Sequence, residues 1–191
     1  MCGRYAILTD DENDEILKIL EQIQKQEYHS SVQSGEIYPT NHAPVLLSRD
    51  EKLAPEVQIW GFPNFKNKGV IINARSETVM EKHLFRQSVF TKRCVIPSTG
   101  FYEWKHDETR KKYLFRMNGK TPLYMAGLYN EFNGEKRFVV LTTKANDSIA
   151  DVHNRMPVVI NNDLIADWIF DTNRAIAMLN DVPPALVRME A

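Results

Sequence analysis

The sequence predicts one α+β domain, in which mostly antiparallel strands form a partly closed, barrel-like sheet with helices at its periphery. Three observations favour this fold class. Short apolar segments recur along the 191 residues and are most frequent in the second half. The turn signals Asn118-Gly119 and Asn133-Gly134 separate several of these segments. Only a few stretches have helical apolar spacing. No repeat or linker divides the sequence, so we expect a single domain over residues 2–191.

The N-terminal half predicts short strands and two longer helices. Residues 3–8 indicate a first strand, and Thr9 with Glu12 has the spacing of a capping box before a helix over about residues 10–27. Three extended segments and a second helix are expected next, at residues 43–49, 55–60, 70–75 and 76–90.

The C-terminal half is rich in strand signals, beginning with residues 93–97 and 100–106. Asn118-Gly119 predicts a hairpin between the segments that flank it, and Asn133-Gly134 predicts a second hairpin. The remaining elements are expected as a short helix over 145–151, a strand from residue 153, a helix over 163–170, and a peripheral helix or tail over 172–191.

Composition limits the kinds of function. The 24 basic and 25 acidic residues nearly cancel, which excludes a broad basic coat, so any contact with nucleic acid needs a local cluster. The two cysteines are too few for a disulfide framework and have no zinc-site spacing, and we expect neither a metal nor a cofactor. The N-terminus does not have the pattern of a signal peptide, and the apolar runs are too short to span a membrane. We expect a cytoplasmic monomer, nucleoid-associated if bacterial.

Cys2 follows the initiator Met1 and is a candidate for unusual chemistry. Removal of Met1 would leave an α-amine and a thiol on one residue. Such an amine has a reference pKa of about 7.7–8.0 and can attack an aldehyde, after which the thiol can close a thiazolidine ring. A cysteine inside the chain cannot form this ring. For the dipeptide alone, a chance cysteine is an equally open interpretation.

Asn73 and Arg75 lie two residues apart on an extended segment and therefore project to the same face. Asn73 could orient a reacting group and Arg75 could hold a phosphate. The alternative is a strand end that leads into a helix, with Ser76 as the N-cap.

Glu103 and His153 are the candidate proton carriers. Glu103 stands among aromatic residues, where burial would raise its pKa and suit it to acid–base work, although an exposed position on a half-buried strand fits equally. His153 could move protons on a sugar, with Arg155 beside it. An ordinary histidine of a surface loop is the alternative.

Pro44, Trp60 and Phe65 occur in turn-like segments with apolar side chains. They could serve as wedges or stacking surfaces for bases, or could belong to the core and its turns. Cys94 is expected as a small buried residue and not as a nucleophile.

Taken together, these segments resemble the SRAP domain family, first named for SOS response-associated peptidases. The matching segments, in order, are MCGRY, NHAP, WGFP, INARSET, RCVIPSTGFYEW, LTTKAN and HNRMPVV. They run from residue 2 to about residue 160, and the C-terminal segment adds nothing to the resemblance.

The resemblance implies specific roles for these residues. Cys2 would crosslink to the ring-opened sugar aldehyde of an abasic site, with Asn73 positioning the N-terminal amine. Glu103 would shuttle protons and His153 would assist opening of the sugar ring. Three arginines would hold the DNA backbone: Arg4, Arg75 and Arg155. Three apolar residues would form a wedge at the duplex: Pro44, Trp60 and Phe65. The wedge loop departs from the family pattern, because Phe65 stands where a tryptophan is usual.

Three functions remain as hypotheses. The first is covalent capture of abasic sites in single-stranded DNA during a DNA-damage response. The second is a cysteine-type peptidase that acts on its own N-terminus, between Met1 and Cys2. The third is a single-strand binding module in which Cys2 has no chemical role. No serine–histidine–aspartate or cysteine–histidine spacing supports a general protease.

Overall fold

The centre of the fold is a closed ring of five strands. The computed structural model describes residues 2–9, 13–25, 32–65 and 68–191. Pairing of β11 with β12 closes the ring, so the predicted barrel-like sheet is confirmed. In ring order the strands are β3 (His42–Arg49), β4 (Lys52–Trp60), β12 (Glu135–Lys144), β11 (Leu123–Phe132) and β8 (Arg93–Ser98). The β4–β12 pair is parallel and the other pairs are antiparallel.

Short strands extend this barrel. β7 runs parallel to β12, while β13 and β14 are antiparallel to β12 and β11 respectively. A separate two-stranded sheet joins β5 and β6. The bounds of these strands are β5 (Phe62–Pro63), β6 (Val70–Ile71), β7 (Asn73–Arg75), β13 (Arg155–Pro157) and β14 (Val159–Ile160).

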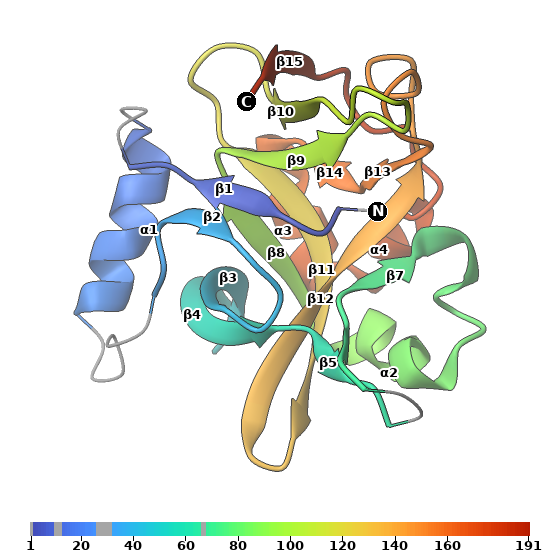
Figure 1. The fold of residues 1–191 in the computed structure, drawn as a ribbon. Helices are drawn as coiled ribbons and strands as arrows, with labels where there is room; N and C mark the ends of the chain where they lie inside the picture. The colour runs from blue at the N-terminus through green and yellow to red at the C-terminus, as the bar shows by residue number, and fades with distance from the viewer. Residues whose placement is uncertain (1, 10–12, 26–31, 66–67) are drawn as a thin grey trace.

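A five-stranded antiparallel sheet lies across the barrel, and Figure 1 shows β1 and β9 crossing in front of β8 and β11. Its order is β15 (Val187–Glu190), β10 (Lys112–Arg116), β9 (Gly100–Trp104), β1 (Tyr5–Ile7) and β2 (Gly35–Ile37). The inner face of this sheet shares one buried cluster with the barrel, in which Phe101 and Phe115 join Met125 and Val140. Burial of such side chains supplies most of the stabilising free energy.

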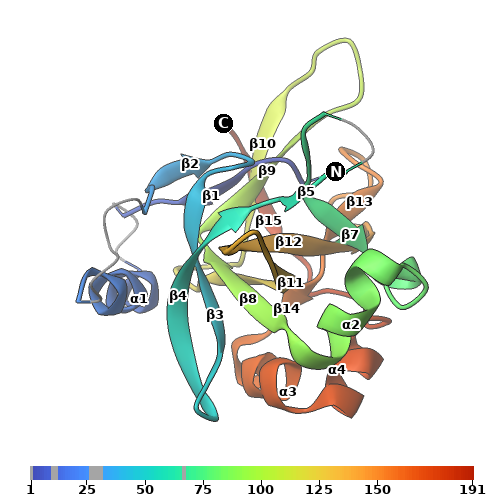
Figure 2. The same ribbon diagram turned by 90° about the horizontal axis from the view of Figure 1, so that it is seen from below.

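Three helices cover the outside of the barrel on one side and α1 packs on the other, as Figure 2 shows. The helical elements are α1 (Asp14–Gln24), η1 (Ser76–Thr78), α2 (His83–Thr91), η2 (Asn162–Leu164), α3 (Ile165–Phe170) and α4 (Thr172–Met178). Arg93 ties the helices together, because its guanidinium donates to the carbonyl oxygens of Val89, Phe90, Trp168 and Ile169. These carbonyls lie at helix C-termini, which attract a cation.

Several element predictions need correction. The first helix begins at Asp14, with Asn13 as its N-cap, so Thr9 is not the cap; Glu12 lies outside the described residues. Residues 76–90 contain a 3₁₀ turn before the shorter helix α2. Residues 145–151 form turns and not a helix, because the Asn146 side chain accepts bonds from the backbone and hydroxyl of Ser148.

The two Asn-Gly signals have different outcomes. Asn133 and Gly134 both have positive φ and join β11 to β12 in the predicted hairpin. Gly119 also has positive φ, but the predicted hairpin around it is wrong. The strand before it, β10, pairs with β9 and β15, whereas β11 belongs to the barrel.

The C-terminal segment, predicted as a peripheral helix or tail, contains both α4 and β15. Ala175 and Met178 of α4 are buried against the barrel, and β15 is an edge strand paired with β10. In the part of the chain that the structure describes, no helix is long and apolar enough to cross a membrane.

Candidate active site

Cys2 is fully buried just before β1, and its thiol approaches the Arg4 carbonyl oxygen at 3.8 Å. Burial raises the pKa of this thiol well above its ordinary value, and the negative charge of Glu103 raises it further. The thiol is therefore protonated at neutral pH. Any reaction that uses its sulfur needs a nearby base.

Glu103 is positioned by the alternation of β9. Phe101 and Glu103 face inward, whereas Tyr102 and Trp104 pack on the outer face of the sheet. Only 4% of Glu103 is exposed, and burial raises its pKa to about 7. Of the two positions considered for Glu103, the structure shows the buried one and excludes the exposed one.

Asn73 holds the backbone of Cys2. Because β7 runs parallel to β12, Asn73 lies opposite Val140 at the barrel edge. Its Nδ2 donates to the carbonyl oxygen of Cys2 at 2.9 Å. Its Oδ1 is buried with no hydrogen-bond partner among the described residues, and so can accept from an incoming donor.

His153 is largely buried, which excludes an ordinary surface-loop histidine. Its Nδ1 lies 3.0 Å from the backbone nitrogen and 3.2 Å from the carbonyl oxygen of Arg155, and these two contacts orient the ring. Burial lowers the pKa of His153, and the charges of His106 and Arg155 contribute. Cys2 shares one buried cluster with Val152 and Met156, on either side of His153.

A hollow of about 450 Å³ opens beside His153. The ring of His106 meets that of His153 edge-on, with 4.8 Å between centroids. The hollow is also lined by Lys105, Asp107 and Asp151. A hollow of this size next to His153 can admit a small polar group.

The three candidate clamp arginines differ in their partners. Arg4 donates from Nη1 to Glu36 at 3.0 Å. Arg155 makes a bidentate pair with Glu77, through two hydrogen bonds. Arg75 is exposed and makes no ion pair with the described residues. Cations of this kind are suited to phosphate.

Several buried polar atoms without hydrogen-bond partners among the described residues belong to this region. They are Arg4 Nε, Tyr5 Oη, Asn73 Oδ1 and Arg155 Nε. Buried polar atoms are almost always paired in folded proteins, so these atoms need partners from water or from a bound molecule.

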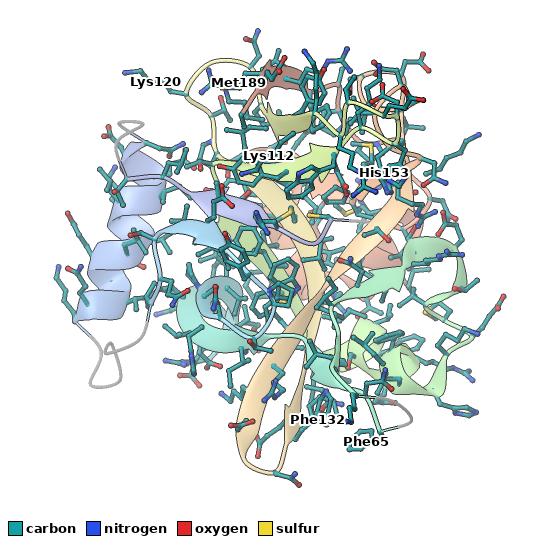
Figure 3. All side chains as sticks on the ribbon, viewed as in Figure 1. Phe65, Lys112, Lys120, Phe132, His153 and Met189 are labelled. Atoms are coloured by element: carbon teal, nitrogen blue, oxygen red, sulfur yellow. The ribbon has the colours of Figure 1, made fainter. Side chains whose placement is uncertain are left out.

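Two of the three wedge candidates are buried and the third lies away from this site. Pro44 is buried within β3, and Trp60 is fully buried with its Nε1 donating to the Ile72 carbonyl oxygen at 3.0 Å. Both belong to the core. Phe65 is exposed beside Phe132, and Figure 3 places that pair at the opposite end of the view from His153.

Sequence reasoning missed the neighbours that complete the site. Lys112 of β10 forms an ion pair with Glu36 of β2. No sequence signal joins two residues so far apart. His106 stacks edge-on against His153 although 47 positions separate them, and no local pattern predicts that contact. The described residues hold no group of His, Cys, Asp and Glu arranged for a metal ion.

Comparison with known proteins decides the family. The family model described as SOS response associated peptidase (SRAP) matches residues 1–189. The chain belongs to the SRAP family.

Named relatives cover most of this SRAP chain. It is 31% identical over 186 residues to the "Abasic site processing protein YoqW" of Bacillus subtilis, covering 91% of this chain and 82% of that protein. It is 26% identical over 177 residues to the "Abasic site processing protein YedK" of Escherichia coli, covering 88% and 79%. The match to "Abasic site processing protein HMCES" of Xenopus tropicalis is 30% identical over 173 residues and covers 69% and 52%.

Solved structures share the fold. A crystal structure of a Bacteroides thetaiotaomicron protein superposes with a TM-score of 0.77 at 21% identity, covering 99% of this chain and 91% of that one. The crystal structure of a phage-related protein from Bordetella bronchiseptica gives a TM-score of 0.75 at 24% identity, covering 100% and 94%. At these identities the likeness concerns the fold.

Proposed function

We propose that this protein captures abasic sites in single-stranded DNA by forming a thiazolidine crosslink through Cys2 after removal of Met1. The observation that carries the proposal is a buried Glu103, with a pKa of about 7, close enough to Cys2 to raise the pKa of its thiol. The naming of relatives as abasic site processing proteins supports the choice of lesion. Such a crosslink would shield the lesion during a DNA-damage response.

The reaction has two steps, a condensation and an addition. The α-amine of Cys2 attacks the aldehyde carbon of the ring-opened sugar, and the resulting carbinolamine loses water to give an imine. The thiol then adds to the imine carbon and its proton reaches the nitrogen. One C–N and one C–S bond form, one water leaves, and no oxidant is needed.

The site residues fit the proton movements of these steps. Because the Cys2 thiol is protonated at neutral pH, sulfur attack needs a base, and Glu103 is poised to accept and return a proton there. The Asn73 bond fixes the Cys2 carbonyl and thereby the direction of the amine. The neutral ring of His153 can exchange a proton with the sugar hydroxyl during ring opening.

The same electrostatics work against the peptidase alternative. A cysteine peptidase needs a thiolate, which a cationic or polar surrounding stabilises. Here burial and the negative charge of Glu103 both oppose ionisation of Cys2. The remaining form of peptidase activity is cleavage of the protein's own bond between Met1 and Cys2. The N-terminal mass of freshly translated protein tests for this cleavage.

Single-stranded DNA is the proposed partner because the cationic groups are few and local. Arg4, Arg75 and Arg155 flank the site in a chain of net charge −1. A small number of phosphate contacts suits one strand near a lesion better than a long duplex.

The test mixes protein lacking Met1 with an oligonucleotide that carries one abasic site, and separates the products on a denaturing gel. We expect a shifted band with the wild type and none with Cys2→Ala, while unmodified DNA gives no band. A band of equal intensity with Cys2→Ala would refute the role of Cys2.

A further inference from the structure

Glu36 is held by three donors that come from three parts of the chain. Its Oε2 accepts from Arg4 Nη1 at 3.0 Å and from Tyr38 Oη at 3.2 Å, and its Oε1 accepts from Lys112 Nζ. Burial alone would raise the pKa of Glu36, but the bonds from Lys112 and Tyr38 and the charge of Arg4 outweigh it and hold the pKa below its usual value. The cluster therefore binds an anion, here a carboxylate.

Aromatic rings surround the cations of this cluster. The Arg4 guanidinium lies 4.2 Å from the centroid of Tyr38 and 5.0 Å from that of Trp104. Lys112 Nζ lies 4.0 Å from the centroid of Tyr102 and 5.7 Å from that of Trp104. Cations that alternate with aromatic rings along a sheet face are typical of surfaces that bind single-stranded nucleic acid.

The cluster is close to the reactive residue. Arg4 is two residues after Cys2, so their Cα atoms are at most about 7 Å apart. Lys112 and Arg4 contact the same Glu36 carboxylate, so the whole cluster lies beside the segment that carries Cys2. A strand captured at Cys2 therefore brings its neighbouring phosphates near this cluster.

A phosphodiester matches what the cluster holds. Like a carboxylate, it is an anion with two equivalent oxygens that only accept hydrogen bonds. Arg4 also retains donor capacity, since its buried Nε has no hydrogen-bond partner among the described residues. Tyr38 and the side chains of Arg4 and Glu36 are partly exposed, so a phosphate can approach from solvent.

We propose that Arg4, Tyr38 and Lys112 form a binding site for a backbone phosphate of the captured strand, and that Glu36 occupies this site until the strand arrives. The proposal rests on the single-strand binding proposed above. With Glu36 in place the cluster of Arg4, Lys112 and Glu36 carries one net positive charge instead of two. Glu36 thereby limits affinity for undamaged DNA, so that covalent capture and not charge attraction determines which strand is retained.

The test measures binding of a fluorescein-labelled, undamaged single strand by anisotropy across a range of salt concentrations. No crosslink can form with this probe. We expect Glu36→Gln to bind about 5- to 10-fold more tightly, with a salt dependence steeper by about 0.7 in the logarithmic slope, the contribution of one phosphate contact. Lys112→Gln should act in the opposite direction, with about 3- to 10-fold weaker binding and a shallower slope.

Glu135→Gln is the matched control. Glu135 also accepts from an arginine, Arg137 at 2.7 Å, and the substitution changes the net charge equally, but it lies at the β11–β12 hairpin. We expect it to change affinity by less than about 2-fold, because a distant exposed charge is screened by salt.

The proposal is overturned if Glu36→Gln binds no more tightly than Glu135→Gln, or if Lys112→Gln leaves affinity and salt slope unchanged. Thermal unfolding checks that each variant is folded; should Glu36→Gln not fold, Lys112→Gln decides alone. Crosslinking to an abasic oligonucleotide is measured separately. If the wild type crosslinks but Glu36→Gln does not change the affinity for undamaged DNA, only the phosphate site is refuted. If Glu36→Gln binds undamaged DNA more tightly but the wild type forms no crosslink, only the capture chemistry is refuted.

Discussion

Replacing Glu103 with glutamine should separate the stability of the protein from its chemistry. Glu103 is a buried carboxyl group whose pKa burial raises from 4.5 to about 7. Glutamine has nearly the same shape and carries no charge at any pH. The substitution therefore removes the cost of a buried negative charge together with the proposed proton carrier.

The magnitude follows from linkage between protonation and folding. Between pH 4.5 and about 7 the folded state keeps a proton on Glu103 that the unfolded state has lost, so the free energy of unfolding falls as the pH rises through this window. The pKa difference corresponds to about 3 kcal/mol. This loss is complete above pH 7 and absent below pH 4.5.

Urea denaturation at pH 4.5 and pH 8 measures the effect in wild type and Glu103→Gln. Relative to the wild type, the variant should gain about 3 kcal/mol of unfolding free energy between the two pH values, while its crosslinking rate falls about 10²-fold or more. A stability difference between the two proteins that does not change with pH would refute the raised pKa of Glu103.

Three further substitutions test other parts of the account. Asn73→Ala removes the 2.9 Å hydrogen bond to the Cys2 carbonyl oxygen. We expect gel assays to show crosslinking slowed about 10-fold or more, while the unfolding free energy falls by only about 1 kcal/mol. An unchanged crosslinking rate would contradict the positioning role of Asn73. Arg93→Met leaves four carbonyl oxygens without the donor they have in the wild type. The unfolding free energy measured by urea denaturation should fall by about 3 kcal/mol, and a fall below about 1 kcal/mol would contradict the bridging role of Arg93. Gly127→Ala places a Cβ 2.9 Å from the Val139 carbonyl oxygen and should lower the unfolding free energy by about 1–3 kcal/mol; a thermal midpoint equal to that of the wild type would show that the barrel yields at this point.

Turn residues in the sequence predicted the turns themselves, but they predicted the pairing of the flanking strands in only one of two cases. Asn133-Gly134 supplies two positive-φ residues, and the strands on either side of it pair with each other. The same dipeptide at Asn118-Gly119 makes a turn, but the strands around it separate. Their pairing depends on which faces are buried in the barrel and in the crossing sheet, and this is a property of the whole chain.

The site shows the same division. The aromatic neighbours in the sequence were enough to make Glu103 a candidate, but its burial depends on the barrel that closes beneath β9. For Trp60 the sequence left two alternatives open, a stacking surface for bases and a place in the core. It is buried, with its ring edge-on to Tyr5 at 5.1 Å between centroids. The pairing of Glu36 with Lys112 spans 76 positions and has no local signature.

The intact mass of the crosslinked product tests the central claim most directly. Protein lacking Met1 is incubated with an abasic single strand, and the adduct is measured without a reducing agent and then mapped by proteolysis. The account predicts a mass equal to the sum of protein and DNA less one water, with the modification on the N-terminal peptide at Cys2. An adduct on a lysine, or one that survives only after chemical reduction, would contradict thiazolidine capture by Cys2.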